Sequence, residues 1–317
     1  MINTPVCDML GIKYPIFQGG MAHISDAKLA AAVSNGGGLG IISAASGNVG
    51  YVSEQIDIAK SLTDKPFGVN LMLMGNNINS LAKLIADKKV SVVTTGAGNP
   101  EKYIPMWKEA GVRVIPVVAS CALAKLVERA GADAVIAEGG ESGGHVGDLT
   151  TMALIPQVCD NVNIPVIAAG GIADGRGVCA AFMLGASGVQ IGTRFLVAKE
   201  CSISRAYKDR VLKANDTSTV VTGKRLGHPV RSIKSAFSRK YAKAEYSTIS
   251  DEELEAMAVG TLRAAVVDGD EKNGCFLAGQ IAGMVSKEEN AADIIKEIFD
   301  QAEQILHDKT AFSSFIS

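Results

Sequence analysis

The chain has 317 residues, 47% of them hydrophobic, and a formal net charge of −2. The hydrophobic content and low net charge exclude an intrinsically disordered chain, and the near-neutral charge gives no reason to expect nucleic acid as a partner. Neither a membrane span nor a secretory signal is predicted, because no run of about 18 apolar residues occurs and the first residues lack a basic segment followed by an apolar one.

Eight short apolar runs recur along the first two thirds of the chain. They are rich in β-branched residues and bounded by Gly or Pro, which is typical of parallel strands buried on both faces. The runs span residues 14–18, 39–43, 66–71, 90–95, 113–118, 133–138, 164–170 and 188–192.

Helical patterns alternate with these runs, at 25–37, 101–111, 121–131 and 176–186. The first begins at Ser25, which we expect to be its N-cap. This alternation predicts an α/β fold, a closed TIM (β/α)8 barrel. A doubly wound sheet is the alternative, but it would usually carry a G-x-G-x-x-G turn after the first strand, and "QGGMAHIS" lacks that spacing.

The rhythm breaks after the eighth run. We predict a barrel over residues 1–196, a helical insertion over the barrel mouth at 197–262, and a C-terminal segment at 263–317. An amphipathic pattern at 290–306 predicts a closing helix. Residues 217–244 contain seven basic residues and no acidic one. These are Lys224, Arg225, Arg231, Lys234, Arg239, Lys240 and Lys243. The segment is either a solvated face or a contact for an acidic carrier protein or a cofactor phosphate.

The loops after the strands of such a barrel carry its functional groups. After strands seven and eight, the residues Gly170, Gly171, Gly192 and Thr193 offer backbone N–H groups and one hydroxyl. Loops at these positions often bind phosphate, so we expect a phosphate site there. The alternative is a pair of tight turns that simply need glycine.

Loops one, three and four suggest a flat ligand. Backbone at Gly19, Gly20, Met21 and Ala22 could lie against a ring, and Asn70 could donate and accept hydrogen bonds at its edge. Asn70 could instead cap a turn. The low wall formed by Gly96, Ala97 and Gly98 would admit a second planar molecule, although glycine before Asn-Pro is also an ordinary loop.

The stretch "AEGGESGGHVGD" (137–148) surrounds one histidine with four glycines. We expect these glycines to disfavour a helix or a good strand and to let His145 approach a bound ring, where an imidazole could give or accept a proton. An isolated histidine is more often structural. Glu141 and Asp148 are expected to cap the loop or to support it from behind. The other histidines and the six cysteines, of which the closest pair is 20 residues apart, show no ligand spacing, so no metal site is predicted, and the scattered thiols suit a reducing cytoplasm.

Several of these segments together resemble the FMN-dependent enoyl-acyl-carrier-protein reductase II family, within the nitronate monooxygenase (2-nitropropane dioxygenase-like) group. The similarity runs in order over nearly the whole chain. Its motifs are "YPIFQGGMA", "GGLGII", "DKPFGVNLML", "TTGAGNP", "IAEGGESGGHVG", "IPVIAAGGIADGRG", "VQIGTRF", "GHPVR" and "AGQIAG".

The resemblance implies a TIM barrel that holds FMN, is reduced by NADPH or NADH, and saturates the trans-2 double bond of enoyl thioesters on acyl carrier protein in bacterial fatty-acid synthesis. It also implies a homodimer, often stimulated by a monovalent cation, with His145 as the active-site histidine and Gln280 as a ring neighbour. The implied flavin contacts are Gly19, Gly20, Met21, Ala22, Asn70, Glu138, Gly143, Gly171, Gln190, Ile191, Gly192 and Thr193. The monooxygenase branch, in which the flavin reacts with oxygen without NAD(P)H, is the alternative.

Overall fold

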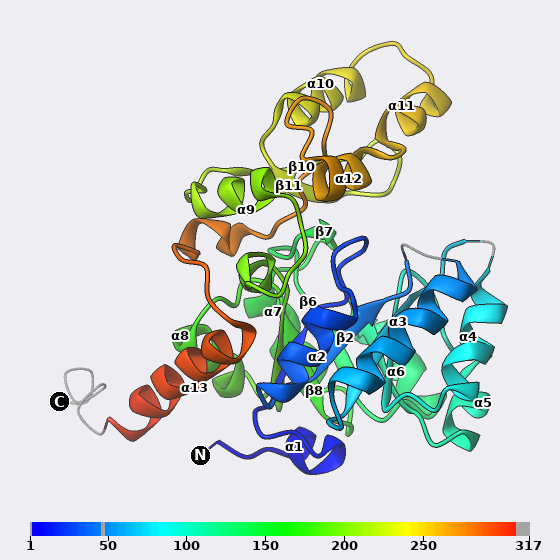
Figure 1. Cartoon of the computed structure of the whole chain (residues 1–317), viewed down its shortest axis with the longest axis vertical. Helices are drawn as coiled ribbons and strands as arrows, with labels where there is room; N and C mark the ends of the chain where they lie inside the picture. Colours follow the sequence, from blue (N-terminus) through cyan, green and yellow to red (C-terminus); the bar gives the residue numbers. More distant parts are fainter. Residues whose placement is uncertain (1, 46–47, 76, 309–317) are drawn as a thin grey trace.

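Eight parallel strands form a ring, and helices cover its outer face (Figure 1). The computed structural model describes residues 2–45, 48–75 and 77–308. The ring strands are β1 (Ile16–Gln18), β2 (Gly40–Ser43), β3 (Phe67–Met72), β4 (Val92–Gly96), β5 (Arg113–Val118), β6 (Val135–Glu138), β8 (Val166–Ala169) and β9 (Gly188–Ile191).

The strand order confirms the predicted barrel. Neighbouring strands pair in parallel from β2 through β9 to β1, and a bridge between Phe17 and Leu39 closes the ring. Every predicted strand is present, and most are one or two residues shorter than their apolar runs. Continuous burial explains this agreement, because side chains on both faces of each strand are covered.

Helices pack around the ring in the order that the sequence predicts. They are α2 (Ala27–Asn35), α3 (Val49–Leu62), α4 (Ile78–Asp87), α5 (Ile104–Glu109), α6 (Cys121–Arg129), α7 (Thr151–Cys159), α8 (Gly175–Met183) and the closing helix α13 (Ala291–His307). The predicted closing helix is confirmed. It buries Ile294, Ile298 and Phe299 on one face, and it packs against α8 and α2.

The expected N-cap at Ser25 is wrong. Asp26 caps α2, and its side chain accepts a hydrogen bond from the Leu29 N–H at 2.9 Å. The Ser25 hydroxyl instead folds the loop after β1, because it accepts from the Met21 N–H at 2.9 Å and donates to the Gly19 carbonyl at 3.0 Å. The serine therefore shapes a cavity-facing loop rather than the helix.

The interior of the ring is apolar, and α1 (Pro5–Leu10) adds Val6 and Leu10 to this core. The helix lies at the end of the barrel opposite the insertion (Figure 1). The open end is therefore the one where the strands finish, as in other barrels of this kind.

The insertion stands over that open end and is only partly helical (Figure 1). It contains α9 (Arg205–Leu212), β10 (Thr219–Thr222), β11 (Val230–Ile233), α10 (Ala236–Glu245), α11 (Asp251–Ala258) and α12 (Thr261–Arg263), and three short helical turns, η1 (Thr193–Val197), η2 (Ala264–Asp268) and η3 (Gln280–Met284), lie at its borders.

Two features of the insertion differ from a purely helical cover. Strands β10 and β11 form a hairpin, and β11 pairs with β7 (Gly144–His145) in the loop after β6. The glycine-rich loop contains no helix and only this two-residue strand, for which β11 supplies the hydrogen-bonding partners. The boundary at residue 262 stays a prediction. Beyond it η2 packs on α9, and the Phe276 ring lies 5.1 Å from Tyr207.

None of the helices in the described part of the chain combines the length and apolarity that crossing a membrane requires.

Candidate functional site

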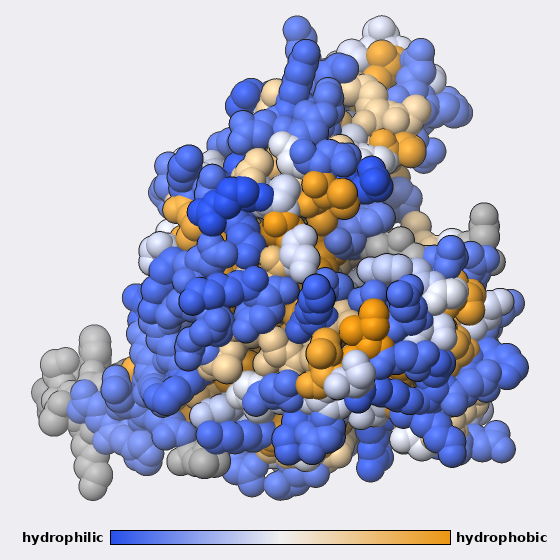
Figure 2. Space-filling view, in the orientation of Figure 1, coloured by the Kyte–Doolittle hydropathy of each residue, from blue (hydrophilic) through white to orange (hydrophobic). Residues whose placement is uncertain are grey.

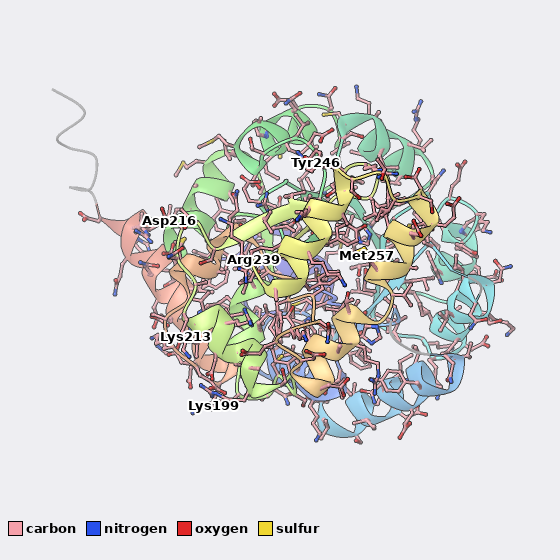
Figure 3. The ribbon with its side chains drawn as sticks, turned by 90° about the horizontal axis from the view of Figure 1, so that it is seen from above. Lys199, Lys213, Asp216, Arg239, Tyr246 and Met257 are labelled. Carbon is pink, nitrogen blue, oxygen red and sulfur yellow. The ribbon has the colours of Figure 1, made fainter. Side chains whose placement is uncertain are left out.

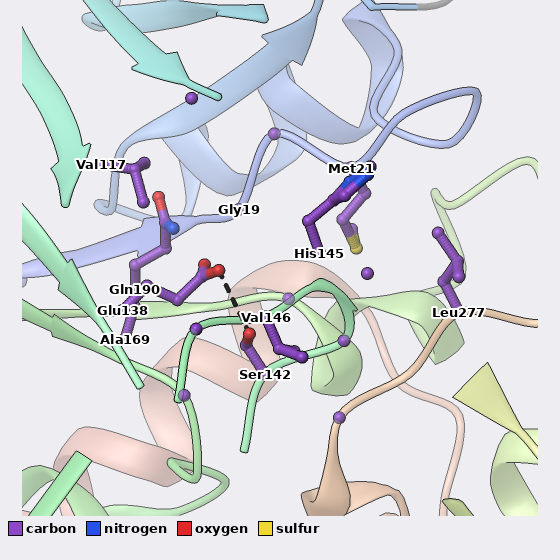
Figure 4. A pocket seen from close by; sticks show the side chains of 18 of the residues that line it. Gly19, Met21, Val117, Glu138, Ser142, His145, Val146, Ala169, Gln190 and Leu277 are labelled. Carbon is purple, nitrogen blue, oxygen red and sulfur yellow. Dashed lines mark hydrogen bonds between the residues drawn. The ribbon is translucent and has the colours of Figure 1, made fainter. Parts of the chain in front are cut away.

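A cavity of about 560 Å³ opens where the barrel strands end, beneath the insertion. Its volume lies within the range of small-molecule sites. Figure 2 shows apolar surface where the insertion meets the barrel, and Figure 4 shows the side chains inside. The candidate residues that line the cavity are Gly19, Gly20, Met21, Ala22, Asn70, Gly96, Ala97, Gly98, Glu138, Gly143, His145, Gly170, Gly171, Gln190, Ile191, Gly192 and Thr193.

Gln280 lies outside this lining and is exposed. It begins η3, and its backbone N–H donates to the Glu141 carbonyl at 2.9 Å. The neighbours Gly279 and Ile281 face the cavity instead. Gln280 is therefore not among the residues that the structure brings together in the cavity lining, and its role as a ring neighbour stays a prediction.

The loops after β8 and β9 form the part of the cavity expected to take phosphate. Gly170 and Gly171 adopt φ values of 92° and 70°, a backbone that favours glycine. Among the described residues, no acceptor takes a hydrogen bond from the N–H of Gly171 or Gly192. The Thr193 hydroxyl accepts from the Gly279 N–H at 2.8 Å, so its own hydrogen stays available to an anion.

A second wall is built by the loop after β1 and by Asn70 on β3. A methyl group on Gly20 would lie 2.3 Å from the Asn70 Cβ, so only glycine permits this approach. The Asn70 amide donates to the Gly20 carbonyl at 3.3 Å, and its oxygen accepts from the Thr94 hydroxyl at 2.9 Å. These bonds fix the amide and leave its second N–H for a ligand. Asn70 does not cap a turn here.

The wall after β4 is low, as predicted. A methyl group on Gly96 would meet nothing within 4 Å, so packing within the protein does not require glycine there. Ala97 adopts φ of 55°, which is uncommon for alanine. The loop thus leaves open space on the cavity side.

Glu138 ends β6 inside the cavity. The Ser142 hydroxyl donates to its carboxylate at 3.1 Å (Figure 4). Burial in this position raises the pKa of Glu138 to about 7, against the opposing effect of the Ser142 hydrogen bond. No ion pair reaches Glu138 within the described ranges, so near neutral pH the carboxyl group is protonated in a substantial fraction of molecules.

His145 is positioned by strand pairing, since β7 lies beside β11 and His145 is opposite Val230. Its ring is exposed to the cavity, together with that of His228, which lies two residues before β11. Burial, and then the nearby His228, lower the pKa of His145 below its usual value. The imidazole is therefore neutral at pH 7, with one nitrogen that donates and one that accepts.

The glycines of this loop serve close packing within the protein. A methyl group on Gly139 would lie 2.2 Å from the Thr151 hydroxyl, and one on Gly143 would lie 2.6 Å from the Ala278 backbone. The idea that they only clear space beside a ring is therefore incomplete. They let the loop fit between α7 and the segment that leads to η3.

Two charged side chains hold the loop. The Glu141 carboxylate accepts from the Thr151 N–H and hydroxyl at 2.9 Å, which confirms its predicted capping role. The Arg231 guanidinium donates to the Gly140 carbonyl at 2.9 and 3.2 Å. Asp148 is exposed. Arg231 is thus a structural part of the site rather than a free surface charge.

Sequence reasoning missed His228 and the role of Arg231. Both follow from the pairing of β11 with β7, which connects segments far apart in the chain. The motif "GHPVR", which contains both residues, was the available signal. Within the described residues, no group of three or more His, Cys, Asp or Glu side chains could hold a metal ion.

Comparison with known proteins places this chain in a family. The model of the family described as "Nitronate monooxygenase" matches residues 3–83 and 73–301. A solved structure of FabK from Thermotoga maritima is 48% identical, covers 100% of both chains and superposes with a TM-score of 0.96.

Two relatives with other names are also similar over nearly their whole length. A (3aS,4S,5R,7aS)-5-hydroxy-7a-methyl-1-oxo-octahydro-1H-indene-4-carboxyl-CoA dehydrogenase from Mycobacterium tuberculosis is 35% identical and covers 98% of both chains. A probable nitronate monooxygenase from Staphylococcus aureus is 34% identical over 95% of this chain and 98% of the relative.

Proposed function

This chain belongs to the nitronate monooxygenase family of flavin-dependent oxidoreductases. We propose that it is an enoyl-thioester reductase of that family, which uses NADPH or NADH to reduce enoyl groups attached to acyl carrier protein. The observation that carries the proposal is the 48% identity to FabK over the full length, against 34% and 35% to the differently named relatives. The cavity supports the proposal, since His145 can donate a hydrogen bond into it and the open wall after β4 leaves room for a planar ligand and a thioester.

The residues present fit FMN. Its phosphate would meet the N–H groups of Gly171 and Gly192 and the Thr193 hydroxyl, while its ring would lie along Gly20 and Asn70. Glycine backbone and a fixed amide are what a phosphate and a hydrogen-bonding ring edge require. The chemistry that bound FMN supplies is hydride transfer, from NAD(P)H and then to the β-carbon of the enoyl thioester.

His145 supplies the polar part of the reaction. As hydride reaches the β-carbon, negative charge develops on the thioester oxygen, and a neutral imidazole can donate a hydrogen bond to it. Such a bond strengthens as the charge grows, so it stabilises the transition state more than the bound substrate. His145, or a water that it holds, then delivers the proton to the α-carbon.

A second candidate is a nitronate monooxygenase, which the family's name and the Staphylococcus relative favour. The same histidine could then receive a proton from the carbon beside the nitro group. In that reaction the nitronate replaces NAD(P)H as the electron donor and oxygen replaces the enoyl thioester as the acceptor, so the two candidates differ in what reduces the flavin and in what reoxidises it.

The absorbance of the flavin under anaerobic conditions distinguishes the two candidate functions. We expect the FMN-loaded protein to lose its yellow colour on addition of NADH or NADPH, and crotonyl thioester to restore it. Bleaching by a nitronate but by neither nicotinamide would overturn the reductase proposal and support the monooxygenase. Loss of colour that crotonyl thioester does not reverse would contradict the proposed substrate.

Two further expectations come from the family resemblance. We propose that the chain is a homodimer, which light scattering would test, and that a monovalent cation stimulates it, which a comparison of K⁺ or NH₄⁺ with a bulky organic cation would test. A monomeric mass, or rates that do not depend on the cation, would contradict these expectations.

A further inference from the structure

The seven basic residues of the segment 217–244 fall into two groups, those that bind other parts of the protein and those that are exposed without an ion-pair partner among the described residues. Arg231 holds the Gly140 carbonyl, and Arg225 pairs with Asp251 at 2.8 Å and donates to the carbonyls of Ser247 and Ile249. These two arginines are structural. The remaining five basic residues are exposed.

Three of the free charges lie on one face of α10. Arg239, Lys240 and Lys243 are exposed, while Phe237, Ser238, Tyr241 and Glu245 are buried. None of the three takes part in an ion pair among the described residues. Spacings of three and four residues put these like charges side by side on the helix, which opposes helix formation. The face is therefore unfavourable for the helix itself.

The acidic residues of α10 and α11 form no ion pair with this face among the described residues. The Glu245 carboxylate is buried and accepts from the Arg225 N–H at 3.0 Å. On the adjacent helix α11, Asp251 pairs with Arg225, and the Glu253 side chain accepts from the Ser250 N–H in the helix's own capping box. Glu252 and Glu255 of α11 are exposed, and neither forms an ion pair with the α10 face in the described part of the chain. The three cations of this face therefore remain available to a partner.

The position of α10 connects this face with the site. β11 carries the pairing partner of His145, and Lys234 follows four residues after Val230, roughly 13 Å along an extended strand. α10 begins two residues later, at Ala236. At its far end Tyr246 is 90% exposed, and an exposed aromatic beside cations is a common interface anchor. Figure 3 looks down on the insertion and labels Arg239 and Tyr246.

We propose that the face formed by Arg239, Lys240, Lys243 and Tyr246 docks the acidic carrier protein that delivers the enoyl thioester. The inference rests on the proposed function for its substrate. The positive charge of the face favours an acidic occupant. β11 connects α10 with the strand that carries His145, which is the direction that a flexible prosthetic arm would take from a partner seated here.

The test uses the FMN-loaded protein and measures carrier-protein binding first and enoyl-thioester turnover second. In R239E/K243E, the dissociation constant for fluorescently labelled holo-acyl carrier protein should rise about tenfold, since two attractive contacts become repulsive. KM for crotonyl carrier protein should rise similarly while KM for crotonyl-CoA stays unchanged. Y246A should weaken carrier binding without changing KM for crotonyl-CoA.

The matched control is K65E/K125E, which makes the same change in net charge on the barrel. It should leave carrier binding and both KM values unchanged. Equal losses in both double variants, or carrier binding that R239E/K243E does not weaken, would overturn the docking site. A wild-type protein that binds the carrier but reduces neither thioester would instead refute the proposed function while the docking site stands.

Discussion

Glu138→Gln should make the protein more stable than the wild type at alkaline pH and not at acidic pH. Glu138 lies in the cavity with one hydroxyl donor and no cationic partner within the described residues, and burial raises the pKa of Glu138 from 4.5 to about 7. Below pH 4.5 the carboxyl group is protonated whether the chain is folded or unfolded, so burying it does not lower the free energy of unfolding. Between pH 4.5 and 7 the folded state binds the extra proton, and folding stability falls as pH rises.

The size of the effect follows from the two pKa values. Each pH unit between 4.5 and about 7 removes about 1.4 kcal/mol from the wild type, about 3 kcal/mol in total, and glutamine does not titrate. The difference in unfolding free energy between variant and wild type should therefore grow by up to about 3 kcal/mol from pH 4.5 to pH 8 and stay constant above that.

The assay is denaturant unfolding of the FMN-free chain at several pH values for both proteins. Glu109→Gln, an exposed substitution at the end of α5, is the control and should track the wild type throughout. A variant-minus-wild-type difference that does not change between pH 4.5 and 8 would refute the reasoning, because it would mean that Glu138 ionises as freely when folded as when unfolded.

The remaining predictions concern the loops around the cavity. His145→Ala should keep FMN bound and lower kcat for crotonyl thioester by about 10²–10⁴-fold, as expected for loss of a general acid; near wild-type turnover would contradict the role. Gly20→Ala should lower the free energy of unfolding by about 1–3 kcal/mol, because its methyl group would overlap Asn70. It should also weaken FMN binding, measured by flavin fluorescence, and unchanged affinity would argue against that wall as a cofactor contact. Arg231→Gln should lower kcat by releasing the Gly140 carbonyl while circular dichroism stays unchanged; a rise in KM for carrier-linked substrate alone would instead assign Arg231 to docking.

The barrel and most of the cavity could be predicted from sequence because both depend on local signals. Continuous apolar runs identify buried parallel strands, and in a (β/α)8 barrel the loops after those strands must meet at one end. That geometry alone predicts that Gly20, Gly171 and His145 share one cavity, and all three line it. Glu138 is different, because only the family resemblance pointed to it.

What could not be predicted depends on contacts between distant segments. His228 reaches the cavity because β11 pairs with β7, and Arg231 reaches Gly140 by the same pairing. A two-residue strand containing Gly144 carries no periodic signal of its own. The choice of Asp26 over Ser25 as N-cap has a similar origin, since the serine is taken by a loop that the sequence pattern does not describe.

The insertion is part of the candidate site rather than a cover added to it. The loop that carries His145 is held by α7 through Glu141, by β11 through Arg231, and by the segment entering η3 through the Gln280 N–H. Two of these three supports come from chain beyond residue 196, outside the predicted barrel. A barrel that kept every strand but lost the insertion would retain the candidate phosphate loops, while its histidine would lose both its pairing strand and its arginine clamp. Flavin binding and turnover should therefore separate when the insertion is perturbed.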